Sequence, residues 1–135
     1  MAKEAIGSNA IFTGTQKGLT ITGSKCYAYS GNIIINNTTA DLLTFNTGKH
    51  ILEVNIYWYG RIAHVGGSKI IQQLVTFNGI NIFDNTRLTG TGTPWQDFDV
   101  MPFIIPPFTL VNVSLANDNV GDIIYGANLT GKVVE

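Results

Sequence analysis

Residues 50–59 read HILEVNIYWY and carry the clearest structural pattern in the chain. Large apolar residues occupy every second position, in the order Leu52, Val54, Ile56 and Trp58. Successive side chains of a strand point to opposite faces, so these four would share one face. The intervening positions, Ile51, Glu53, Asn55, Tyr57 and Tyr59, would share the other. The stretch therefore predicts a β-strand with one face in a core.

Turn signals on both sides of this stretch divide the chain into further short strands. Asn78-Gly79 favours a tight hairpin, because a type I′ turn needs positive φ at both residues. Pro106-Pro107 predicts a stiff corner or a protected edge, because proline fixes φ and has no amide donor. The other candidate strands are 10–15, 19–22, 25–36 with a bulge or bend at Ser30-Gly31, 41–45, 69–77, 80–83, 96–104, 108–115 and 123–133.

The composition agrees with a fold built from strands. Only 13% of the 135 residues are charged and 44% are apolar, so the polar surface must rely on Asn, Thr, Ser, Gln and Gly. Thr favours pleated positions and Asn and Gly favour turns, whereas exposed helices need Glu, Lys, Arg and Ala. We expect an all-β fold: a flexible N-terminal arm over 1–8, then one jelly-roll-like β-sandwich of about eight to ten strands over 9–135.

Charge, hydropathy and cysteine count argue against nucleic-acid binding, membrane spanning and an internal disulfide. The net charge of −1 and the scattered lysines and arginines argue against nucleic acid. The longest apolar run, 100–111, is too short and too rich in proline to span a bilayer, so no membrane is expected. The single cysteine, Cys26, excludes an internal disulfide and is expected to be a buried apolar residue. No signal peptide is recognisable, which predicts synthesis in a cytoplasm.

No catalytic or metal-binding constellation is convincing. His50 and His64 lack metal-ligand spacing, so each is expected at the surface or at a strand end. Asp97 and Asp99 lie two residues apart beside Trp95, a layout also found in glycan hydrolases, but a solvated strand face explains them more simply. The prediction is a protein that is not an enzyme and has no catalytic residues.

Two loop segments contain residue types that ligand sites use. Residues 117–122 resemble a fragment of a calcium loop, but a hairpin turn accounts for the same residues, and calcium remains an open alternative. Residues 90–93, Gly-Thr-Gly-Thr, lack the lysine and the following helix of a phosphate loop. No cofactor and no metal are therefore predicted.

Exposed aromatic residues supply the one candidate ligand site. Trp58 falls on the apolar side of residues 50–59, which leaves Tyr57, Tyr59 and Trp95 for a sugar-stacking platform. The same three side chains would equally suit a protein–protein interface.

Three stretches carry a resemblance: residues 27–33 with 42–48, the hairpin centre 77–80, and 104–109 leading to 129–133. They resemble small single jelly-roll structural proteins of viruses, especially tailed bacteriophages. The resemblance covers most of the chain from about residue 27 onward. It implies a capsid decoration, cement or minor capsid protein, commonly trimeric, and it carries no active-site residues.

Together these features lead to a main hypothesis, an alternative and a third, lower-ranked hypothesis. The main hypothesis is a virion structural protein that associates with itself, as a homotrimer, and binds the major capsid protein. The alternative is a carbohydrate- or receptor-binding module of a viral particle that uses Tyr57, Tyr59 and Trp95. A hydrolase that uses Asp97 and Asp99 ranks third.

Overall fold

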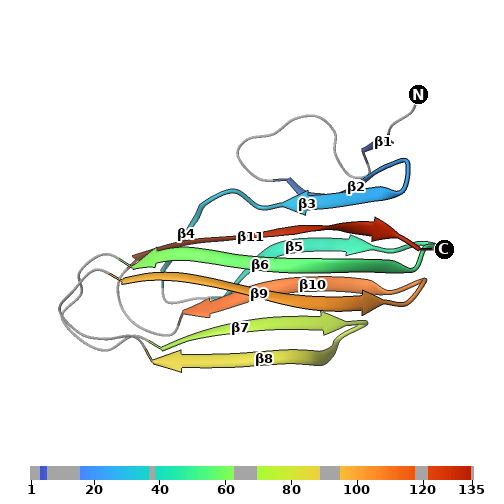
Figure 1. Cartoon of the computed structure of the whole chain (residues 1–135). Coiled ribbons are helices and arrows are strands. Elements are labelled where there is room, and N and C mark those ends of the chain that lie inside the picture. Colours follow the sequence, from blue (N-terminus) through green and yellow to red (C-terminus); the bar gives the residue numbers. More distant parts are fainter. Residues whose placement is uncertain are drawn as a thin grey trace.

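The computed structural model describes residues 4–5, 16–36, 39–62, 70–88, 95–117 and 122–134. Within these ranges it is all-β, and eleven strands pair antiparallel in two facing sheets (Figure 1). The strands are β1 (Glu4–Ala5), β2 (Gln16–Thr22), β3 (Lys25–Tyr29), β4 (Ile33–Asn36), β5 (Thr39–Asn46), β6 (Leu52–Ile62), β7 (Ile70–Phe77), β8 (Ile80–Leu88), β9 (Trp95–Ile105), β10 (Leu110–Asn117) and β11 (Asp122–Val133). The expected all-β class is confirmed.

The order of the strands defines a jelly roll. The first sheet runs β1-β2-β3-β11-β6-β9, with β4 also paired to β11, and the second sheet runs β5-β10-β7-β8. With β3 and β4 taken as one interrupted strand, the main strands from β3 onward are eight in number among the described residues. The first sheet then holds the first, eighth, third and sixth of them, and the second sheet holds the second, seventh, fourth and fifth. Two interlocked Greek keys give this order, so the predicted jelly-roll sandwich is confirmed.

The core lies between the two sheets and follows the alternation expected for residues 50–59. Leu52, Ile56 and Trp58 are 0% exposed, and Val54 is 3% exposed. From the second sheet, β10 buries Val111, Val113 and Leu115 completely. Trp58 stacks on Phe83 of β8 with 5.4 Å between the ring centroids, so a ring from each sheet meets inside the sandwich.

The bend predicted at Ser30-Gly31 separates β3 from β4 without breaking their attachment to β11. The amide of Ser30 donates to the carbonyl of Ala127 at 2.9 Å. The Ser30 hydroxyl accepts from the amide of Ala127, also at 2.9 Å. Buried Ser30 therefore replaces one ladder bond with its side chain, which satisfies the backbone groups at the bend.

The two predicted turns are present, and one strand starts later than expected. Asn78 and Gly79 both have positive φ, 53° and 83°, as a type I′ hairpin requires. The Pro106-Pro107 corner joins β9 to β10. Phe108, expected to open the next strand, instead lies in the corner with a φ of 55°, and β10 begins at Leu110. The two prolines prevent a regular ladder there, which moves the start of the strand.

Some sequence-based expectations fall on residues that the structure does not describe. These are the candidate strand 10–15, His64, residues 90–93 and residues 118–121. Of the arm expected over 1–8, Glu4 and Ala5 form β1 and pair with Ile21 and Thr20 of β2. The flexibility of the arm stays a prediction.

Candidate functional site

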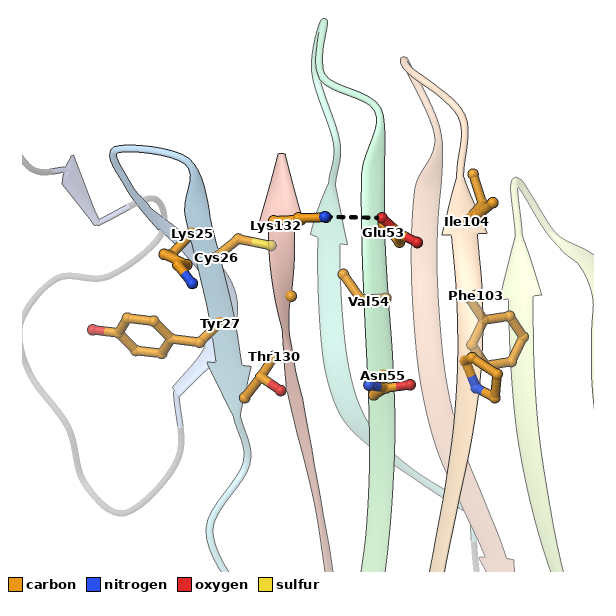
Figure 2. Close-up of a pocket in the computed structure, with 12 residues that line it drawn as sticks. Lys25, Cys26, Tyr27, Glu53, Val54, Asn55, Phe103, Ile104, Thr130 and Lys132 are labelled. Atoms are coloured by element: carbon orange, nitrogen blue, oxygen red, sulfur yellow. Dashed lines mark ion pairs between the residues drawn. The ribbon is translucent and has the colours of Figure 1, made fainter. Parts of the chain in front are cut away.

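An open groove of about 1090 Å³ lies on the outer face of the first sheet and crosses β3, β11, β6 and β9 (Figure 2). We call this surface the groove face. Its outward residues come from alternate positions of the four strands and include Lys25, Tyr27, Tyr29, Glu53, Asn55, Tyr57, Tyr59, Val100, Pro102, Ile104, Asn128, Thr130 and Lys132. The strand pairing therefore brings together residues from four separate parts of the sequence.

Charged residues form one row across the groove. Lys132 on β11 pairs in register with Lys25 on one side and with Glu53 on the other. Its Nζ lies 3.6 Å from Oε1 of Glu53, and Figure 2 shows this ion pair spanning the two strands. Both side chains are more than half exposed, so solvent screens the pair and it adds little to stability. The row holds two cations and one anion.

A polar floor and an apolar wall adjoin this charged row. Thr130 of β11 and Asn55 of β6 are register partners, and both are exposed. Among the described residues, neither of these two side chains has a hydrogen-bond partner within the chain. Pro102 and Ile104 of β9 form the wall, and Ile104 is 69% exposed. A ligand here would meet hydroxyl, amide, charged and aliphatic groups at once.

The predicted aromatic platform is partly assembled on the same face. Tyr57 and Tyr59 both point outward from β6 and are half-buried, and Tyr57 shares a row with Asn128 and Tyr29. Tyr29 in turn stacks on Tyr27, with 6.4 Å between ring centroids. The sequence shows Tyr27 and Tyr29 alternating with Cys26 and Ala28, but only the pairing of β3 and β6 with β11 brings these tyrosines to the face of Tyr57.

Trp95 occupies a different phase of the ladder from the two tyrosines. On β9, Val100 pairs with Tyr57 and Phe98 pairs with Tyr59, whereas Trp95 pairs with Ile62. Trp95 is three residues from Phe98, and an odd separation along a strand corresponds to the opposite face. The side chain of Trp95 lies outside the described residues, so its place in a ligand site stays a prediction.

Tyr59 lies over Gly126, and this contact explains the glycine. A Cβ on Gly126 would sit 2.8 Å from the Tyr59 hydroxyl and would also overlap the carbonyl of Gly31. Burial raises the pKa of the Tyr59 phenol above its ordinary value of 10.0. Tyr59 is therefore held against the sheet and protonated at neutral pH.

The expectation that Asp97 and Asp99 share a solvated face is wrong for Asp99. Asp99 pairs with Trp58, which sets it in the inward phase of β9. Its Oδ2 accepts from Nε2 of Gln73 at 3.0 Å, and the same Nε2 donates to the Tyr125 hydroxyl at 2.8 Å. Asp99 therefore belongs to a polar network that joins the two sheets. The side chain of Asp97 is outside the described residues.

Two other residues weighed for chemistry have structural surroundings. Cys26 is 2% exposed, as predicted, and burial raises the pKa of its thiol to about 11. A protonated, buried thiol is a poor nucleophile. His50 ends the β5–β6 turn, where its amide donates to the carbonyl of Thr47 at 3.2 Å.

The described ranges contain neither a metal-binding cluster nor a membrane-spanning helix. No three residues of the types His, Cys, Asp and Glu are grouped there as metal ligands. No helix in the same ranges has the length and hydropathy to cross a bilayer. Asn117, at the start of the possible calcium segment, donates from Nδ2 to the carbonyl of Ile35 at 3.1 Å.

A second exposed feature is the end of the sandwich where the β5–β6, β7–β8 and β9–β10 connections meet (Figure 1). We call it the turn end. The Thr47 hydroxyl accepts from the amide of Thr109 at 3.0 Å and donates to the carbonyl of Pro106 at 2.9 Å. Asn78 Oδ1 accepts from the amide of Leu110 at 2.8 Å. These bonds tie the three connections to one another.

The turn end holds apolar side chains out into solvent. Phe108 is 71% exposed, Leu110 is 47% exposed and Ile80 is 67% exposed. Phe108 also has the left-handed backbone conformation, which is a rare state for a bulky side chain. Its amide donates to the carbonyl of Gly48, so neighbouring turns hold this conformation.

Comparison with known proteins leaves the chain without an assigned family. No family model matches it, and no curated protein matches it. Among solved structures, it is similar to dimeric latent PorU from Porphyromonas gingivalis, at 15% identity and a TM-score of 0.37 over 76% of this chain. It is also similar to infectious bursal disease virus, Gx strain, at 12% identity and a TM-score of 0.35 over 79% of this chain. The chain spans 10% and 29% of those two chains. Likeness at this level supports no inference about function.

Proposed function

We propose that this chain is a structural subunit of a virion, of the capsid decoration, cement or minor capsid type, and that it works without catalysis. It would be made in the host cytoplasm, associate with copies of itself as a homotrimer and bind the major capsid protein. Support comes from the jelly-roll strand order and from the low content of charged residues. A surface with few charges resists association less than a highly charged one.

The turn end is the observation that carries this proposal. Phe108 and Leu110 are exposed on a segment fixed by hydrogen bonds to two other connections. Rigid, exposed aromatic side chains are efficient interface anchors because they lose little conformational entropy on binding. Phe108 also keeps a backbone conformation that costs free energy in the isolated chain. Contact with another subunit or with the capsid would bury this ring.

The variant Phe108→Gly tests the proposal because it separates folding from association. Glycine accepts positive φ freely, so the unfolding free energy should stay unchanged or rise by about 1 kcal/mol. Size-exclusion chromatography with light scattering should give a trimer for the unmodified chain and a monomer for the variant. Cosedimentation with purified capsids should weaken at least tenfold.

The matched control is Val100→Ser, which removes a 46%-exposed apolar side chain from the groove face instead of the turn end. It should leave both the mass and the cosedimentation unchanged. An unmodified chain that is a monomer and does not bind capsids would exclude the proposed function. A Phe108→Gly variant that assembles normally would exclude the turn end as the surface through which the subunits associate.

The second candidate function is a carbohydrate- or receptor-binding module of the particle. It is favoured by the groove and by the tyrosines that share its face, which the fold brings together from β3 and β6. Sugar rings bind to surfaces that combine aromatic faces with hydrogen-bonding side chains. A glycan array distinguishes the two functions, because a purely structural subunit binds no glycan.

A further inference from the structure

We infer that the groove binds an acidic oligosaccharide, one whose sugar rings carry carboxylate groups. This inference rests on the second candidate function and names its ligand class. It also moves the binding site from Tyr57 and Tyr59 to the neighbouring groove, where Lys25 and Lys132 would hold the carboxylate.

The charged row provides the first step. Lys25 and Lys132 are direct cross-strand partners, and like charges at such positions destabilise a sheet. Among the described residues, Glu53 is the one carboxylate that lines the groove, and it pairs with Lys132. Lys25 has no ion pair within the described residues. Only 13% of the residues in the chain are charged, so two neighbouring lysines are a local excess of positive charge. An anionic group of a ligand would balance it.

The shape and lining of the groove provide the second step. An open groove of about 1090 Å³ across four strands suits an extended ligand better than a single small ion. Thr130 and Asn55 present a hydroxyl and an amide on its floor, and Pro102 and Ile104 present aliphatic carbon on one wall. Sugar rings have the same combination of hydroxyl edges and apolar faces.

The position of the groove favours a glycan over an acidic peptide. Peptides that bind sheets add a strand to an edge and use its free backbone groups. The floor of this groove is formed by β11 and β6, which are paired on both sides and have no free edge. The backbone hydrogen-bonding groups of these two strands are used by the ladders, so a ligand there would form its hydrogen bonds with side chains, and Thr130 and Asn55 on the floor are groups suited to hydroxyls.

The test compares matched ligands on the full chain. Oligogalacturonate and its methyl ester have the same rings and differ in charge, and 3′-sialyllactose and lactose form a second pair. Calorimetry or an array should show the acidic member of at least one pair binding tenfold more tightly or better. An acidic peptide of equal charge should bind more weakly than the acidic glycan.

Four single variants locate the site. Lys25→Gln and Lys132→Gln should each weaken binding about fivefold to tenfold. Glu53→Gln should strengthen it about twofold, because it removes a competing carboxylate. The control, Lys49→Gln, removes an exposed lysine of the β5–β6 turn and should change nothing.

Each outcome decides the inference. Equal binding of acidic and neutral glycans, or equal effects of Lys25→Gln and Lys49→Gln, overturns it and leaves the carbohydrate-binding function standing. Preference for the acidic peptide also overturns it. If no glycan binds at all, both the inference and the carbohydrate-binding function are excluded, while trimer formation and capsid attachment are judged separately.

Discussion

One row of the groove face reads Tyr29, Asn128 and Tyr57 across β3, β11 and β6. A row on the outer face of the second sheet reads Thr44, Asn112 and Thr76 across β5, β10 and β7. Both rows cross three antiparallel strands, point outward and have asparagine in the middle, but the side chains on either side of the asparagine differ greatly in size. On the first sheet Asn128 lies between the aromatic rings of Tyr29 and Tyr57, whereas on the second sheet Asn112 lies between two short threonine side chains.

The fold and the candidate binding surface therefore use separate residues. Inward positions hold the two sheets together, and outward positions are left to define what each face can contact. Neighbouring residues in one strand should therefore differ sharply in their effect on stability. Substitutions at adjacent inward and outward residues should show this separation most strongly, and changes of charge at Cys26 and Lys25 should show it with smaller effects.

Gly131→Val should have the largest effect, a loss of about 3 kcal/mol in unfolding free energy. A Cβ there would overlap the carbonyl oxygen of Glu53 and lie 2.6 Å from Cα of Val54, so β11 and β6 would have to separate. The adjacent outward variant, Thr130→Val, should change stability by less than about 0.5 kcal/mol. Urea unfolding measures both, and equal losses would refute the proposed separation of roles.

Gln73→Leu should lower the unfolding free energy by about 2 kcal/mol. Gln73 is fully buried, donates to Asp99 and Tyr125 of the first sheet, and accepts from Asn85 at 3.1 Å. The variant would leave these groups without their partner between the sheets. Its neighbour Gln72 points outward and donates to Asp84, so Gln72→Leu should cost less than about 0.5 kcal/mol. The prediction would be contradicted if thermal unfolding showed that the Gln72→Leu variant is no more stable than the Gln73→Leu variant.

Alkaline pH should destabilise the chain through the inward thiol of Cys26. Burial raises its pKa from 9.0 to about 11, so the unfolded chain loses this proton at lower pH than the folded chain. The contribution of the buried thiol to the unfolding free energy should therefore be fully present below pH 9. About 1–2 kcal/mol of unfolding free energy should be lost between pH 9 and 11. The raised pKa of Tyr59 acts in the same direction above pH 10. Cys26→Ala should flatten this part of the pH profile, and an unchanged slope would exclude the thiol as its cause.

The smallest expected effect is a gain from Lys25→Glu, about 0.5 kcal/mol at low ionic strength. The substitution replaces a like-charged cross-strand pair with an opposite one at the groove, next to Lys132. Added salt should remove the gain because both side chains are exposed. A more stable variant that no longer binds acidic glycans would show that the groove face keeps an unfavourable pair for a ligand. A loss of stability at low salt would contradict the argument.

Much of the fold was predictable from sequence because it depends on local pattern. The alternation in residues 50–59, the Asn78-Gly79 hairpin and the bend at Ser30-Gly31 each reflect backbone preferences that a few neighbouring residues determine. Burial of Cys26 followed from the same alternation. The left-handed Phe108 was not predictable. Pro106-Pro107 indicates a corner, but its geometry depends on the Phe108 amide, which donates to the carbonyl of Gly48, and on the Thr47 hydroxyl, which donates to Pro106 and accepts from Thr109.

The candidate site was much less predictable, because it depends on register. Lys25, Glu53 and Lys132 lie far apart in the chain and become neighbours only when β3, β11 and β6 pair. Asp99 was misplaced for the same reason, since a strand's phase relative to the core is unknown until its partner is known. The sequence by itself determined an all-β chain with alternating strands, because side-chain periodicity is local. Tertiary structure alone decided which outward residues share a face, because cross-strand pairing is set by the whole sandwich.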